Sequence, residues 1–228
     1  MIASVVGLVL VGSLIVLVTD GSGGGGPDSF DGSIDRGLKV RTGKELETYL
    51  LAAGELTAGL TVKPESVESD GTYTDKESPI PALTPCAPEE TAELSLEYPI
   101  AQAAFNQGTE WPLFSEVLMV FPKKMAIKFM NEYESQYAKC KEYKVDGEQR
   151  VSVTVERANF GDSSLRMKAH NLDYDPTDST SGSDAETLLV RVGGTIVFMS
   201  VNSAGGSVPS DVLEKLASKA VGKIVNGG

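Results

Sequence analysis

Strand-length segments that follow one another directly in the second half of the sequence constrain the fold more than any other feature. Apolar and polar residues alternate strictly in residues 151–155 and 165–169, as in strands that bury one face. Residues 188–192 and 195–201 flank Gly193-Gly194, a two-residue hairpin signal in which both glycines are free to adopt positive φ. Strands joined by such short connections pair antiparallel. The sequence therefore predicts an antiparallel sheet.

Further apolar stretches complete the pattern. Residues 98–105 and 113–121 have strand length and are separated by Asn106-Gln107-Gly108, which suggests another antiparallel pair. Helical spacing of apolar residues predicts helices over about residues 43–53, 123–140 and 212–224. The resulting order is typical of an α+β domain. We expect a mainly antiparallel β-sheet packed on one face by α-helices and preceded by an N-terminal hydrophobic helix.

The N-terminal segment predicts on which side of the membrane the domain lies. Residues 2–18 carry no charge, and a helix of this length spans about 26 Å, slightly less than a hydrocarbon core of about 30 Å. The segment is interpreted as an uncleaved anchor, with a cleaved signal peptide and a mis-assigned start as alternatives. We divide the chain into an anchor or signal segment (1–19), a Gly/Ser-rich linker (20–36) and an extracytoplasmic domain (37–228). The protein is then held at the cell membrane, or secreted if the segment is cleaved.

Charge and composition exclude several classes of protein. The chain has 20 Lys plus Arg against 32 Asp plus Glu, a net charge of −12, which argues against binding to nucleic acid or to an anionic lipid surface. One His and two Cys exclude a multi-His metal centre and a zinc ribbon, so no metal or other cofactor is expected. Acidic residues are concentrated in residues 65–97, a Pro-rich segment that we expect to be mostly irregular, with one short strand at most. That acidic segment is a candidate contact surface for a protein partner.

Cys86 and Cys140 are expected to form a disulfide, because two cysteines in an exported domain most often pair. The bond would close a loop of about 55 residues and contribute about 4 kcal/mol in the chain-entropy model. The alternative is two separate thiols, one of them catalytic. A nucleophilic Cys needs a base, and the single His170 lies thirty residues beyond Cys140. We therefore predict no catalytic residues.

Several short motifs occur in an order that resembles a known family. They are Thr84-Pro85-Cys86, the stretch from Glu116 to Pro122, Ala138-Lys139-Cys140, the turn Gly161-Asp162-Ser163, and the strand from Leu189 to Gly193, followed by the closing helix. Together they look like the PknH-type extracellular sensor domain of actinobacteria, over about residues 43–225. The sequence departs from that family in having no kinase domain and no second cysteine pair.

The resemblance implies a helix-backed sheet outside the membrane, with a cleft for an unidentified ligand. Our first hypothesis is thus a non-catalytic, membrane-tethered domain that binds a small molecule or a cell-envelope component. The alternative is an accessory subunit of a membrane or envelope complex, which would contact its partner through the acidic segment 65–97.

One strand face is the candidate ligand site. Alternation places Arg166, Lys168 and His170 on the face that also shows Ser152, Thr154 and Glu156, and we expect Arg191 to join them. Such cations could hold a carboxylate or phosphate. The alternative is a solvated face with Glu156 paired to a cation. Trp111 could stack on a ligand, or cover the core instead.

Two further motifs are interpreted as loops. Residues 173–184 have carboxylates at calcium-loop spacing, but Asp178 stands where that loop needs Gly, so a flexible acidic hairpin loop is preferred over weak divalent binding. Gly161-Asp-Ser-Ser-Leu165 is similar to the motif of GDSL-type hydrolases. No Asp lies three residues before His170, so we interpret it as a tight turn and expect no enzyme.

Overall fold

The computed structural model of the chain describes the greater part of the predicted domain. The described residues are 38–39, 42–56, 59–62, 68–69, 99–106, 112–145, 149–175, 184–203 and 208–227. The expected N-terminal helix, the linker, Cys86, Trp111 and nearly all of the acidic segment lie outside these ranges. Within them, no helix is both long and apolar enough to span a bilayer.

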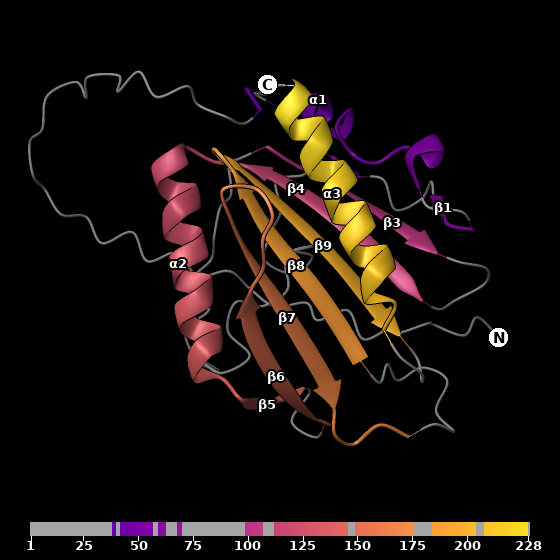
Figure 1. Cartoon of the computed structure of the whole chain (residues 1–228), viewed down its shortest axis with the longest axis vertical. Coiled ribbons are helices and arrows are strands. Elements are labelled where there is room, and N and C mark those ends of the chain that lie inside the picture. The colour runs from indigo at the N-terminus through magenta and orange to yellow at the C-terminus, as the bar shows by residue number, and fades with distance from the viewer. Residues whose placement is uncertain are drawn as a thin grey trace, which may run out of the picture.

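The described chain forms one antiparallel sheet with helices packed on it (Figure 1). The sheet order is β1-β3-β4-β9-β8-β7-β6-β5, and β2 also pairs with β3. The strands are β1 (Thr61–Val62), β2 (Glu68–Ser69), β3 (Ile100–Asn106), β4 (Leu113–Val120), β5 (Glu142–Val145), β6 (Gln149–Arg157), β7 (Ser163–Asn171), β8 (Asp184–Val192) and β9 (Thr195–Ser203). The helices are α1 (Gly43–Glu47), the 3-10 turn η1 (Ala53–Glu55), α2 (Lys123–Lys139) and α3 (Ser210–Gly227).

The expected α+β class and antiparallel sheet are confirmed, but the helices cover both faces of the sheet rather than one. Val117 and Met119 of β4 belong to the core that α2 covers, whereas Leu118 between them belongs to the core under α1 and α3. The physical reason lies in the centres of β8 and β9, where residues 188–190 and 196–199 are unbroken apolar runs. A strand of that kind must be buried on both sides.

Each face has its own hydrophobic core. On the α2 face, the rings of Phe121, Phe129, Tyr133 and Tyr137 follow one another with centroids 5.6, 6.0 and 4.7 Å apart. Phe129, Tyr133 and Tyr137 form the apolar stripe expected from the helical spacing of this segment, and Phe121 extends it from the end of β4. On the opposite face, α3 buries Leu213, Leu216, Ala217, Ala220 and Ile224. Helix α3 packs on β8 and β9, and in Figure 1 α2 lies toward the β5–β7 side of the sheet.

The first helix is shorter than expected. Helix α1 begins at Gly43 after the N-cap residue Thr42, whose hydroxyl accepts from the Glu45 amide at 3.1 Å, and it ends at Glu47 instead of near residue 53. The chain then turns so that the Leu51 amide donates to Glu116 of β4, with a nitrogen to Oε2 distance of 2.8 Å. A tertiary hydrogen bond to the sheet thus takes the amide that a longer helix would have used.

The β8–β9 hairpin is confirmed, and its two glycines have different roles. Gly193 adopts a φ of 60°, in the left-handed region that favours glycine. Gly194 is held against Phe121, whose amide donates to the Gly194 carbonyl at 2.9 Å. A Cβ at Gly194 would lie 2.3 Å from the Phe121 carbonyl oxygen, so only glycine fits there.

Gly194→Ala is expected to lower the free energy of unfolding by about 1–3 kcal/mol, because backbone must move to admit the methyl group. The control is Gly222→Ala in the middle of α3, where no other part of the protein lies within 4 Å of the new Cβ. That variant should be more stable by about 0.5–1 kcal/mol, because alanine favours the helix. Urea titration of both variants tests the pair, and equal effects would contradict it.

Candidate functional site

Three predicted site residues lie together on β7, where carboxylates neutralise them. Arg166, Lys168 and His170 share the face that α3 partly covers, opposite Glu156, Thr154 and Ser152 of β6. Lys168 lies 3.4 Å from Glu156, and His170 contacts Asp184. This arrangement matches the solvated, paired face that was the alternative interpretation of the sequence.

Arg166 is the most strongly held of these cations. Its guanidinium lies 3.2 Å from Glu186 and 3.8 Å from Glu156, and it also contacts Glu214 of α3. Glu186 is only 2% exposed, and the Ser210 hydroxyl donates to its other oxygen at 2.5 Å. Arg166 therefore serves as the counterion of a buried carboxylate. Anion binding by this face stays a prediction, and it would have to displace these contacts.

Arg191 does not join the other cations, and the expectation that it shares their face is wrong. Arg166 pairs with Leu188, whereas Arg191 pairs with Ser163, so the Arg191 side chain lies on the α2 face. There it donates to Asp162 at 3.1 Å and to the Gly193 carbonyl at 3.1 Å. Asp162 also accepts from the Gly193 amide at 2.8 Å. Arg191 thus braces the β8–β9 turn against the turn before β7.

The remaining sequence-based sites are only partly described. Cys140 is buried at the end of α2 and is not a free thiol. Cys86 lies outside the described residues, so the pairing of the two stays a prediction. Trp111 lies outside them as well, as do residues 176–183 of the acidic loop. Asp173 at the start of that loop is bound by Arg150, with an Nη2 to Oδ1 distance of 2.8 Å.

A cavity of about 170 Å³ lies on the α2 face, and sequence reasoning missed it. Register explains why it forms. Ala104, Ser115, Ser200, Thr187 and Met167 follow one another across β3, β4, β9, β8 and β7 as directly paired residues. A second row consists of Leu113, Asn202, Ala185, Ala169 and Val153. The middle of both rows is formed by small side chains, which leave a hollow in the face that the two rows line; we call it the groove.

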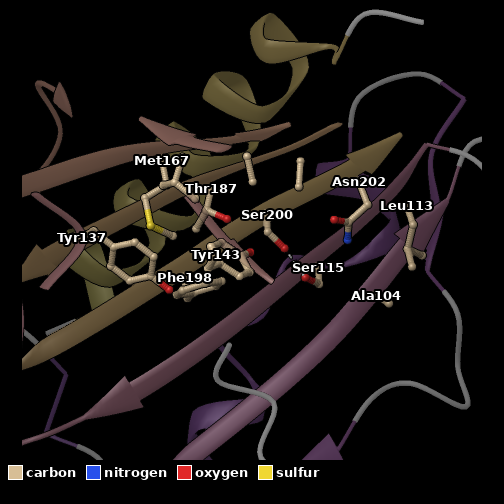
Figure 2. Close-up of a pocket in the computed structure, with 13 residues that line it drawn as sticks. Ala104, Leu113, Ser115, Tyr137, Tyr143, Met167, Thr187, Phe198, Ser200 and Asn202 are labelled. Atoms are coloured by element: carbon tan, nitrogen blue, oxygen red, sulfur yellow. Dashed lines mark hydrogen bonds between the residues drawn. The ribbon is translucent and has the colours of Figure 1, made fainter. Parts of the chain in front are cut away.

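One end of the groove is apolar. Tyr137 of α2, Tyr143 of β5, Met167 and Phe198 line it, and each is less than a tenth exposed. Figure 2 shows Tyr137, Met167 and Phe198 gathered at this end. Burial raises the pKa of Tyr137 to about 12, so its hydroxyl stays neutral at physiological pH.

The other end of the groove is polar and uncharged. The hydroxyls of Ser115 and Ser200 lie 2.6 Å apart, joined by the dashed line in Figure 2, and Asn202 lies beyond them. Thr187 stands directly opposite Ser200 on the other side. None of the described residues that line the groove is charged. The arrangement suits the binding of a small uncharged molecule and supplies no nucleophile with a base beside it.

A buried carboxylate lies on the opposite side of β4 from the groove. Glu116 is fully buried; one oxygen accepts from the Leu51 amide, and the other has no hydrogen-bond partner among the described residues. Burial raises the pKa of Glu116 to about 8, and Lys223 nearby opposes this shift in part. The Lys223 ammonium itself is held by the Leu50 carbonyl at 2.7 Å and by Glu55 at 2.8 Å. Glu116 is therefore mainly protonated at neutral pH.

Glu116→Gln should increase the free energy of unfolding at pH 8 by a few kcal/mol and leave it nearly unchanged at pH 4. The folded chain holds a proton on Glu116 up to about pH 8, whereas the ordinary pKa in the unfolded chain is 4.5. The wild type therefore loses stability as the pH rises from 4.5 to 8, and glutamine removes that loss. Urea titrations across this range test it, with the exposed Glu45→Gln as control. A constant difference between the proteins would contradict the prediction.

Arg166→Ala should destabilise the fold by about 3 kcal/mol, because it leaves the buried Glu186 carboxylate without its counterion. Lys168→Ala removes a half-exposed cation from the same strand face and should cost less than about 0.5 kcal/mol. The measurement is the urea midpoint of each variant. A mild effect of Arg166→Ala would show that the residue is free for another role.

Comparison with known proteins identifies the fold. No family model matches the sequence, and no curated protein matches it. A solved structure that matches is the crystal structure of the extracellular domain of PknH from Mycobacterium tuberculosis. The match covers 85% of this chain and 100% of that chain, with a TM-score of 0.54 and 10% identity. The chain therefore shares, at a distance, the fold of that extracellular domain.

Proposed function

We propose that this protein is a non-catalytic, extracytoplasmic sensor-type domain that binds a small molecule in the groove on the α2 face. The groove is the observation that supports the proposal most. It is concave and mainly apolar, with a few polar groups at one end, as is typical of ligand sites. Its lining comes from α2 and from seven strands, β3 to β9, so a bound ligand would contact the sheet and α2 together.

Two further observations support the extracytoplasmic part of the proposal. The fold is similar to that of an extracellular domain, and residues 2–18 are an uncharged stretch ahead of a Gly/Ser-rich linker. An anchor of that kind would hold the domain at the outer side of the cell membrane. The accessory-subunit hypothesis depends on the acidic segment 65–97, nearly all of which lies outside the described residues, and stays the alternative.

The charge pattern favours the groove over the β7 face as the ligand site. Arg166, Lys168 and His170 already have carboxylate partners, and Arg191 is on the other side of the sheet. In the groove, by contrast, the side chains of Thr187 and Asn202 have no hydrogen-bond partner among the described residues. A ligand in the groove would form new hydrogen bonds without breaking existing ones.

Blocking the groove should abolish binding. Ala185→Leu places a larger side chain in the second row of the groove, whereas Ala138→Leu puts the same change on the exposed surface of α2. The full chain, with ¹³C-labelled methionine methyl groups, is titrated with a library of single-ring compounds. At least one compound should shift the Met167 signal in the wild type and in Ala138→Leu, and none should do so in Ala185→Leu.

Met199 provides an internal control, because it is fully buried on the opposite face of the same sheet. Its signal should move little when Met167 shifts. If no compound moves Met167 in the wild type, or if Ala185→Leu binds as the wild type does, the proposed function is wrong. Circular dichroism of both variants shows whether the leucine has disturbed the fold.

A further inference from the structure

The size of the groove limits what it can hold. A cavity of about 150 Å³ lined by apolar side chains is enough to bind benzene. The groove measures about 170 Å³, only slightly more. Its apolar end presents Met167, Phe198 and the tyrosines at close range, which suits one aromatic or aliphatic ring.

The electrostatics of the groove exclude an ionised ligand. None of its described lining residues is charged, and Tyr137 stays neutral because its pKa is about 12. A carboxylate or ammonium group that enters such a site loses its hydration and finds no counterion among the described lining residues, so its binding is strongly disfavoured. Arg191, the predicted cation on the same face of the sheet as the groove, is engaged by Asp162.

The polar end has hydrogen-bonding capacity that the described protein groups leave unused. Two hydroxyls carry two hydrogens, and the contact between Ser115 and Ser200 uses one of them. The Thr187 hydroxyl and the side-chain amide of Asn202 make no hydrogen bond to a described residue. Ser115, Ser200 and Thr187 also lie in one cross-strand row. A ligand group that both donates and accepts would meet partners on either side.

We infer, on the basis of the proposed function, that the ligand is a neutral single-ring compound that carries a hydroxyl or carboxamide group. The ring lies against Met167 and Phe198. The hydroxyl or amide reaches the polar row, where it completes the hydrogen bonding of Ser115, Ser200 and Thr187. Selectivity for a neutral polar group follows, because a hydrocarbon leaves that row unpaired and an anion has no counterion.

Three compounds of one shape test the inference: toluene, p-cresol and p-toluate, titrated into the full chain with the Met167 methyl signal as readout. p-Cresol should bind about 3- to 10-fold more tightly than toluene, the gain expected for one or two hydrogen bonds. p-Toluate should not bind measurably at the same concentrations. The double variant Ser115→Ala/Ser200→Ala should lose most of the preference for p-cresol over toluene, because it removes the hydroxyl pair and leaves Thr187 as the last hydroxyl of the row.

The control is Ser152→Ala, a change of the same kind on the opposite face of β6, which should keep the preference for p-cresol. If toluene binds at least as tightly as p-cresol, or if p-toluate binds as tightly as p-cresol, the inferred ligand class is wrong. The proposed function is unaffected by either result. The same conclusion holds if other compounds of the library shift Met167 but these three do not. If no compound shifts the Met167 signal, the inferred ligand class and the proposed function are both wrong.

Discussion

The pairing of β4 with β9 holds the rest of the structure together. It runs from Leu113 opposite Asn202 to Val120 opposite Thr195 and joins segments about 85 residues apart. Without it, the strands before α2 and those after it would be two separate sheets. Together they form one sheet whose central strands are covered on both faces. The burial of that centre is the main hydrophobic contribution to stability.

The same pairing places two unlike polar groups back to back on β4. Ser115 faces the groove, where it meets Ser200, and the next residue, Glu116, is buried under α1 and α3. Ser115 hydrogen-bonds to Ser200 at 2.6 Å, and the pair keeps one hydroxyl hydrogen for a ligand. The glutamate keeps a proton instead, because burial raises its pKa more than the Leu51 amide and Lys223 lower it. One strand thus links the proposed ligand site to the contact that holds the α1 segment.

Sequence patterns predicted a helix or strand well where the pattern lies wholly within that element. The spacing of Phe129, Tyr133 and Tyr137 predicted α2, and the alternation in residues 151–155 predicted β6. The short β5 was not predicted, because four residues carry too little periodicity. The length of the first helix was overestimated because its end depends on Leu51 reaching Glu116, a residue 65 positions away.

The sequence by itself determined the α+β class, the order of the main elements and which side of β7 carries Arg166, Lys168 and His170, because a strand alternates with period two whatever its neighbours are. The tertiary structure decided how the strands align. A shift of one residue in the pairing of two strands moves a side chain to the other face of the sheet. For this reason the sequence placed Arg191 on the wrong face. Register also brought Ser115, Ser200, Thr187 and Ala185 together from three strands. Small residues carry no signal alone, and only their alignment creates a groove.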